Sequence, residues 1–174
     1  MGNAPDPAVI ERYLTPLLSD PSNRVRGNVA VVLWSNHFER LVIDRLREML
    51  QSEQWQDRAS AIYAFGEIGS LPAAIHLLTD TIREGRHLKE QALEPYRELA
   101  SLVYAALGDP TPDVVRQAIY ALGKMGERNA ILPIYRILTN ENYPFLKQAV
   151  TESFEKIGIS IQDMKTILTP FERV

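Results

Sequence analysis

The chain has 174 residues, of which 45% are hydrophobic and 24% charged, with a formal net charge of -3. This composition is typical of a folded domain that buries a core, and it argues against a disordered polymer. The slightly acidic balance disfavours nucleic acid as a partner, because nucleic-acid binders usually carry a clearly basic surface. The absence of cysteine excludes disulfides, thiolate nucleophiles and cysteine-ligated metals.

The N-terminal sequence has no basic stretch followed by an apolar run, so it does not resemble a secretory signal. N-myristoylation would need Ser or Thr where Asp6 stands. No uncharged run approaches the roughly 20 residues that a membrane-spanning helix needs. We therefore expect no membrane insertion and a cytoplasmic location.

Proline and glycine punctuate the chain at intervals close to the length of one helix. Proline fits the first turn of a helix and glycine fits its C-terminal end. Between these residues the apolar positions recur at intervals of three and four, and no segment shows sustained alternation with period two. The connections are short, so neighbouring helices should be antiparallel. The expected helices are, in chain order, 7–19, 22–36, 39–51, 56–68, 72–84, 87–107, 112–124, 128–139, 144–156 and 160–169.

Two tryptophans and one proline bear on how these helices pack. Trp34 follows Leu33 at an expected core position, so we expect its side chain in the core. Trp55 lies in a connecting segment and could either pack against the next helix or stand exposed. Pro95 lies inside the sixth expected helix, which it should kink or divide into two short helices.

An internal repeat is the strongest signal in the chain. Residues 61–69 and 118–126 both follow the pattern Ala-Ile-Tyr-Ala-apolar-Gly. Weaker matches lie at 26–34, where Arg26 aligns with Arg58 at an offset of 32, and at 150–158, at an offset of 32 from 118–126. The spacing between each weak copy and its strong neighbour predicts a unit of about 32 residues that holds two helices. The longer gap between the two strong copies leaves room for one shortened unit around Pro95.

The glycines of the repeat predict close packing between helices. Gly66 and Gly123 lie one turn before a helix end, although glycine inside a helix costs about 1 kcal/mol relative to alanine. We therefore expect another helix to cross closely at both positions. Gly69, Gly126 and Gly158 are expected at helix C-termini.

The segment from Asp113 to Gly126, followed by Ala130-Ile131-Leu132-Pro133-Ile134 and Leu138, resembles a HEAT repeat. Its closest resemblance is to the bacterial subgroup named after phycobilisome lyases. Residues 57–78 resemble the repeat nearly as well, and residues 20–46 and 144–168 do so weakly. The resemblance implies an all-α fold, a right-handed α-α superhelix (a HEAT-repeat solenoid) of about five helix pairs with an N-terminal capping helix. It implies a single domain over 1–174, with approximate repeats at 20–51, 55–84, 87–108 (irregular), 110–139 and 143–169.

The sequence shows no pattern typical of catalysis or metal binding. No two of the three histidines, His37, His76 and His87, lie three or four residues apart. Paired carboxylates such as Asp44 and Glu48 have basic neighbours, which explains them as solvated ion pairs. No glycine-rich phosphate loop is present. We therefore expect no enzyme activity, no catalytic residues, no cofactor and no metal.

Three arginines, Arg26, Arg58 and Arg116, recur at similar places in successive units. They could form an anion-binding row. We favour the alternative that each pairs with an acidic residue at a helix start, such as Asp57 or Asp113, and so links neighbouring repeats.

The predicted function is that of a non-catalytic scaffold or adaptor for protein–protein interaction. The resemblance implies that the second helix of each pair faces the concave side, which would place 39–51, 72–84, 128–139 and 160–169 there. The residues expected to contact a partner are Arg40, Asp44, Arg47, His76, Asp80, Arg83 and Arg136. Because arginines predominate among them, an acidic segment of a partner protein would suit this surface.

Three alternative functions remain. The subgroup name suggests a bilin lyase or a chromophore-handling subunit. One family of DNA-repair glycosylases is built from similar repeats, although the acidic balance speaks against it. The pattern from Asn28 to Trp34 is similar to that of HEAT segments that regulate larger transport or signalling proteins.

Overall fold

The computed structural model describes residues 6–36, 38–71, 90–138, 144–160 and 162–163. Within these ranges the chain is helical and contains no strand. The α-helices are α1 (Pro7–Leu14), α2 (Asn23–Trp34), α3 (Glu39–Leu50), α4 (Trp55–Gly69), α6 (Glu90–Ala105), α7 (Pro112–Met125), α8 (Ile131–Leu138) and α9 (Lys147–Ile157). Short 3-10 helices adjoin them: η1 (Thr15–Ser19), η3 (Ala106–Gly108), η4 (Arg128–Ala130) and η5 (Pro144–Leu146). The predicted all-α class is confirmed.

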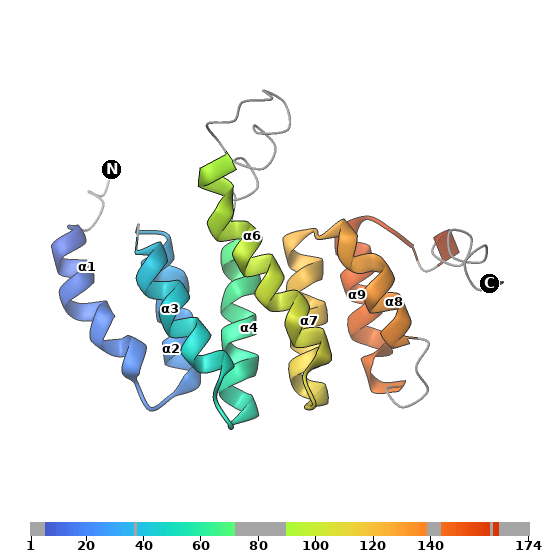
Figure 1. Cartoon of the computed structure of the whole chain (residues 1–174), viewed down its shortest axis with the longest axis horizontal. Coiled ribbons are helices and arrows are strands. Elements are labelled where there is room, and N and C mark those ends of the chain that lie inside the picture. The colour runs from blue at the N-terminus through green and yellow to red at the C-terminus, as the bar shows by residue number, and fades with distance from the viewer. Residues whose placement is uncertain (1–5, 37, 72–89, 139–143, 161, 164–174) are drawn as a thin grey trace.

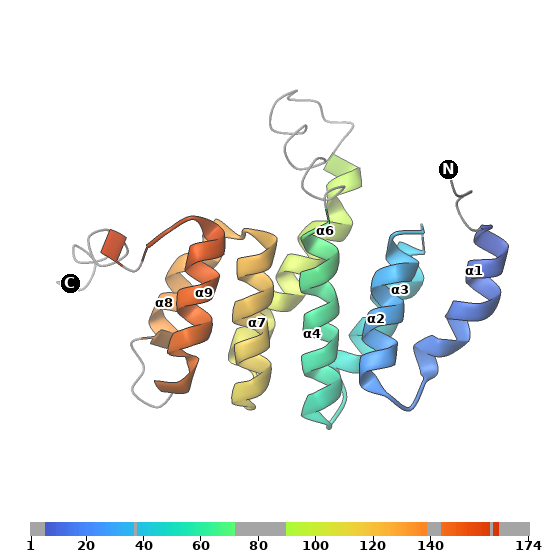
Figure 2. The same cartoon turned by 180° about the vertical axis from the view of Figure 1, so that it is seen from behind.

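The helices stack in two layers (Figure 1). Helices α2, α4, α7 and α9 form a row, here called the packed row, in which each helix packs directly on the next. Helices α3, α6 and α8 form a second layer in front of this row in Figure 1, and Figure 2 shows the packed row from the opposite side. The described helices of the second layer make no comparably extensive contact with one another.

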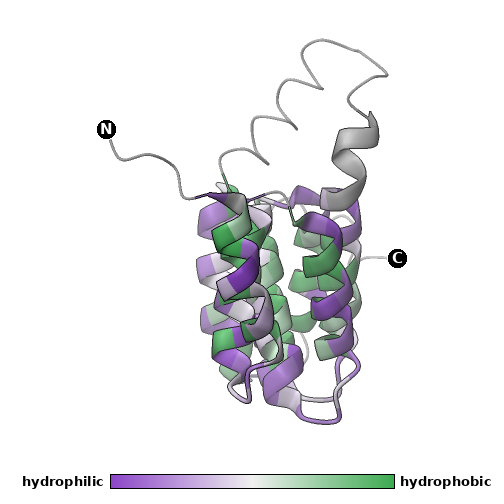
Figure 3. Cartoon of the chain, turned by 90° about the vertical axis from the view of Figure 1, so that its left-hand side faces the viewer, coloured by the Kyte–Doolittle hydropathy of each residue, from purple (hydrophilic) through white to green (hydrophobic). Residues whose placement is uncertain are grey.

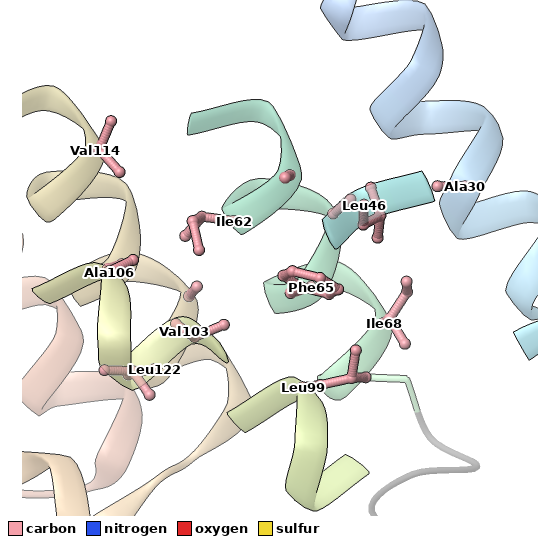
Figure 4. Close-up of a cluster of buried hydrophobic side chains, with 14 of the residues drawn as sticks. Ala30, Leu46, Ile62, Phe65, Ile68, Leu99, Val103, Ala106, Val114 and Leu122 are labelled. Atoms are coloured by element: carbon pink, nitrogen blue, oxygen red, sulfur yellow. The ribbon is translucent and has the colours of Figure 1, made fainter. Parts of the chain in front are cut away.

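The hydrophobic core lies between the two layers. Figure 3 shows the layers as two columns of helices with apolar residues between them. Phe65 of α4 is fully buried, and Leu46 of α3 and Leu99 of α6 enclose it from the second layer (Figure 4). Trp34 is 5% exposed and its ring meets Tyr96 edge-on at a centroid distance of 5.7 Å. The prediction that Trp34 belongs to the core is confirmed.

Small residues set the close spacing of the packed row. A Cβ added to Gly66 would lie 2.8 Å from the Cβ of Ala121 and 2.9 Å from its Cα. A Cβ on Gly123 would lie 2.7 Å from the Cα of Ser153. Both distances are too short for carbon atoms, so α7 could not approach α4, nor α9 approach α7, with larger residues there. The predicted steric demand at both glycines is confirmed.

Two of the three expected glycine C-caps have the expected conformation. Gly126 and Gly158 follow α7 and α9 with φ of 71° and 83°, in the left-handed region that glycine tolerates best. Gly69 differs, because it is the last residue of α4 and is followed by Ser70 in the right-handed region. Gly69 is buried against Met125, so it serves close packing at this end of α4.

The expected division into five repeats stays a prediction, and the stacking of the described helices bears on how they pair. Helix α4 packs directly on α7, so the long gap between the two strong copies of the motif is a single step along the packed row. Helix α6, within the expected irregular repeat 87–108, packs against both α4 and α7. Helix α8 packs on α9 and makes no comparably extensive contact with α7. Among the described helices, α3 packs more extensively on α4 than on α2, and α8 packs on α9, so each of these two pairs with the packed-row helix that follows it. Helix α6 also continues through Pro95 without division.

Candidate partner-binding surface

The packed row has an exposed face on the side away from the second layer. In α4 the buried residues Ile62, Phe65 and Ile68 lie on the core side. Tyr63 points the other way and is 41% exposed, because residues in a helix rotate by about 100° per position. The two alanines of α4 nearest to Tyr63 in the repeat pattern are buried. The repeat therefore presents a large aromatic side chain on a surface that is otherwise closely packed.

A hollow of about 520 Å³ lies on this face between α2 and α4. Its lining combines aromatic side chains, carboxamides and one cation. Trp55 is part of the wall of this hollow and is 39% exposed. Of the two alternatives that the sequence left open for Trp55, the structure therefore shows the exposed one. The lining residues are Asn23, Arg24, Gly27, Asn28, Trp55, Gln56, Ala59, Ser60, Tyr63 and Gln117.

A second hollow of about 160 Å³ continues the first between α4 and α7. Tyr63 and Gln117 line both hollows, so the two form one depression that runs from α2 across α4 and α7, with α9 contributing at its far end. We call this depression the row groove. Its second part is also lined by Gly66, Glu67, Tyr120, Ala121, Lys124 and Lys156.

The charged groups of the row groove are mostly cationic. Lys124 forms an ion pair with Glu67, with 2.5 Å between Nζ and Oε1. Lys156 Nζ lies 6.0 Å from the centroid of the Tyr120 ring. Burial, and then the negative charge of Glu67, raises the pKa of Tyr63 above its ordinary value, so this phenol stays protonated as a hydrogen-bond donor.

Two of the recurring arginines are structural. Arg26 forms an ion pair with Asp57 of the next packed-row helix and donates to the Asp20 carbonyl at 2.7 Å. Arg58 donates from Nε to Asp109 Oδ2 at 2.7 Å and from Nη1 to the Ser52 carbonyl at 2.8 Å. Each arginine therefore ties the loop before its own helix to an acidic residue of the following unit. For these two residues the predicted ion pairs between repeats are confirmed.

Arg26 and Arg58, with the carbonyls and carboxylates that they bind, are here called the arginine ladder. Arg116 does not take part in it. It pairs with Asp113 within α7, and both side chains are more than two-fifths exposed. Alignment of the two strong copies of the motif places Val115, not Arg116, in register with Arg58, and Val115 is 6% exposed. A shift of one position turns the side chain by about 100°, which moves Arg116 away from the loop. The expectation that Arg116 links repeats was therefore wrong.

The residues expected to contact a partner fall into two groups. Arg40, Asp44 and Arg47 are exposed on α3, and Arg136 is exposed on α8, so all four lie in the second layer. Arg47 forms ion pairs with Asp44 and with Glu98 of α6, which gives it a structural role between second-layer helices. The other expected contacts, His76, Asp80 and Arg83, lie outside the described residues. That these residues bind a partner stays a prediction.

Another hollow, of about 410 Å³, lies between α6 and the end of α7. Glu127 and Tyr104 both line it. Burial raises the pKa of Glu127 above its ordinary value, and the neighbouring Tyr104 phenol partly offsets this effect. Burial, with the negative charge of Glu127, raises the pKa of Tyr104 to about 12.

No metal site or membrane-spanning helix appears in the part of the chain that the structure describes. No group of three histidine, cysteine or carboxylate side chains there could hold a metal ion. None of the helices in those ranges is both long and apolar enough to cross a bilayer. The three histidines lie outside the described residues.

Of the side chains that line the row groove, the sequence pointed to Trp55, as a residue that could stand exposed, but not to the tyrosines or the carboxamides. Tyr63 and Tyr120 occupy the same position of the repeat, between an isoleucine and an alanine. Their place on the outer face could have been predicted, because the neighbouring apolar positions already fill the core face of the helix. The contribution of Gln117 to both hollows could not, since it depends on how closely α4 and α7 approach.

The comparisons with known proteins agree with this architecture. A family model described as HEAT repeats matches residues 11–94, which include α2, α3 and α4. A search of curated proteins found no match. Together with the stacked helices described above, the family match supports a HEAT-repeat protein, whose fold is an all-α HEAT-repeat solenoid.

Proposed function

We propose that this protein is a non-catalytic scaffold or adaptor that binds a partner protein through the exposed face of the packed row. HEAT repeats generally mediate protein–protein interaction. The observation that carries the proposal is the row groove, which crosses α2, α4 and α7 and exposes Trp55 and Tyr63. Aromatic residues are among the most frequent anchors of protein interfaces.

The spacing of the two layers supports the choice of this face. Helices of the packed row pack extensively on one another, whereas the described helices of the second layer, α3, α6 and α8, make no comparably extensive contact with each other. A stack of helix pairs bends toward its more closely spaced layer, and the concave side of such a solenoid gathers side chains from every unit. By this argument the packed row forms the inner face, and α3 and α8 face outward.

The test begins with affinity capture by the tagged chain and identification of the protein that co-purifies. The purified partner is then titrated against three forms of the chain: wild type, Tyr63→Ser and Arg40→Glu. Tyr63 represents the row groove and Arg40 the second layer, and both side chains are exposed, so neither change should unfold the protein. We expect Tyr63→Ser to weaken binding at least tenfold, or about 1.4 kcal/mol, and Arg40→Glu to leave it unchanged.

The opposite result would move the binding surface to the second layer. If Arg40→Glu abolished binding while Tyr63→Ser did not, the surface would be the one formed by Arg40, Asp44, Arg47 and Arg136. If neither change had an effect, the partner would not bind through either layer face. Urea melts of both variants would verify that any loss of binding is not a loss of folding.

A further inference from the structure

The row groove offers carboxamide side chains from three helices of the packed row. Asn28 comes from α2, Gln56 from α4 and Gln117 from α7, and all three line the hollow between α2 and α4. A carboxamide both donates and accepts hydrogen bonds, so it can pair with the N–H and the C=O of a peptide unit. Such side chains can hold a polypeptide backbone with little regard to its sequence.

The spacing of the helices suits an extended chain. Packed helices lie about 8–10 Å apart, and close contacts at Gly66 and Gly27 keep this row at the short end. An extended polypeptide advances about 3.3 Å per residue. A segment that crosses the row would therefore meet a new helix about every third residue. A helix rises only about 1.5 Å per residue and is about 10 Å wide, which is a poor fit for a depression divided between two hollows.

The charges at the two ends of the groove favour an acidic ligand. Arg24 stands in the first hollow, and Lys124 and Lys156 stand in the second. Glu67 is the one carboxylate among the described lining residues, and Lys124 pairs with it. The groove thus has a local excess of positive charge on a chain whose net charge is -3. This contrast would steer an acidic segment to this face.

We propose that the row groove binds an extended, acidic segment of a partner protein, with its backbone held by Asn28, Gln56 and Gln117 and its carboxylates near Arg24 and Lys156. This inference rests on the proposed function and specifies the chemistry of the partner. Trp55 and Tyr63 provide apolar contact surface for side chains that project from the segment.

The test uses a random library of twelve-residue peptides, displayed on phage and selected on the intact chain. The enriched peptides are synthesised with a fluorescent label and titrated by anisotropy. We expect these peptides to be rich in Asp and Glu. The double change Arg24→Glu and Lys156→Glu should lower their affinity at least tenfold. The affinity that remains should depend less on salt concentration than that of wild type. The matched control is Arg40→Glu, which reverses one charge in the same way on the second layer. It should leave the affinity unchanged.

A second double variant, Asn28→Ala with Gln117→Ala, tests the backbone contacts. It should weaken neutral and acidic peptides alike, because the carboxamides would contact the backbone and not the side chains. Isotope-edited NMR of a bound peptide should show extended and not helical backbone couplings.

Several outcomes would overturn the inference. These are enriched peptides without acidic residues, equal losses in the Arg40→Glu control, a bound helix, or the absence of any selected peptide. The proposed function would survive such a result if Tyr63→Ser still abolished binding of the captured protein. It would fail separately if that variant bound the protein normally.

Discussion

At the scale of single residues, the packed row depends on positions where no side chain fits. Gly66 meets the backbone of α7 at Ala121, so the clash produced by a larger residue could not be relieved by rotating a side chain. Gly123 meets Ser153 in the same way one step further along. Ser153 is fully buried, and its hydroxyl has no hydrogen-bond partner in the described chain. The hydroxyl is therefore tolerated at a position where size matters more than polarity.

Replacement of Gly66 by Ala should lower the free energy of unfolding by about 1–3 kcal/mol, because overpacking outweighs the better helix propensity of alanine. The matched control is Gly108→Ala, where an added Cβ meets nothing within 4 Å. The control should leave the midpoint of a urea melt unchanged or slightly raised. Equal midpoints for Gly66→Ala and wild type would contradict the steric account of this contact.

Glu127 gives a prediction that depends on pH. Because burial raises its pKa in the folded state, folding favours the protonated carboxyl. The stability that this preference contributes is complete below the ordinary pKa of 4.5 and is lost as pH rises through the folded-state pKa. Glu127→Gln should therefore stabilise the protein at pH 7 and have little effect in acid. Thermal melts at several pH values would show this, and a destabilised variant at pH 7 would refute it.

At the scale of elements, loops and helices are joined by the arginine ladder. Arg26 and Arg58 each bind a carbonyl six residues earlier and a carboxylate of the next unit. Burial alone would raise the pKa of Asp109, but hydrogen bonds from Arg58 and Thr111 outweigh it and hold the pKa below its ordinary value. The ladder thus fixes the distance between α4 and α7 at the end of the row where the loops lie.

Arg58→Met should lower the free energy of unfolding by about 2 kcal/mol at pH 7, because it removes charge-assisted hydrogen bonds and leaves Asp109 without its cation. A carboxylate with a lowered pKa stabilises the fold above its ordinary value of 3.8, and this contribution is lost as pH falls through the folded-state pKa. The difference in free energy of unfolding between Arg58→Met and wild type should therefore become smaller only in strong acid.

The comparison for this ladder is Arg116→Met, which removes an exposed pair within one helix. Such pairs contribute at most a few tenths of a kcal/mol, so this variant should melt within about 0.5 kcal/mol of wild type. Denaturant titrations of both variants at pH 7 would measure the contrast. Equal losses would mean that Arg116 carries a structural contact comparable to that of Arg58.

At the scale of the whole molecule, each packed-row helix packs on its immediate neighbours in the row and on the second-layer helices beside it, and makes no comparably extensive contact with more distant helices of the row. Helix α9 packs on α7 and α8, and α2 packs on α4 at the other end. Stability in such a stack is close to a sum of terms for single units and for the interfaces between neighbours. Damage to one interface should therefore remain local.

Ser153→Leu tests this locality. The larger side chain should push α9 away from α7 and raise the rate of amide hydrogen exchange in α8 and α9. Amides of α2 and α4 should keep their protection, because α9 makes no extensive contact with either helix. A uniform loss of protection across all the helices would instead mean that the chain unfolds as a single cooperative unit.

The sequence by itself determined the helical class, most helix positions and the chemistry of the repeat. Periodicity and punctuation by proline and glycine are local signals, so the starts of α1 and α7 and the glycine ends of α7 and α9 could be predicted. The recurrence of Ala-Ile-Tyr-Ala-apolar-Gly also predicted that Gly66 and Gly123 lie at close contacts, because glycine inside a helix needs a steric reason.

Only the tertiary structure decided how the helices pair, which layer is closely spaced and where a groove forms. A helix can pair with the helix before it or with the helix after it in the chain. Short loops on both sides allow either arrangement, so sequence order alone does not decide between them. Whether a side chain is buried depends equally on its exact position in the repeat. A single position separates Val115 in the core from Arg116 in solvent. The row groove depends on the approach of α2, α4 and α7, which the contacts of their glycines and alanines fix in three dimensions.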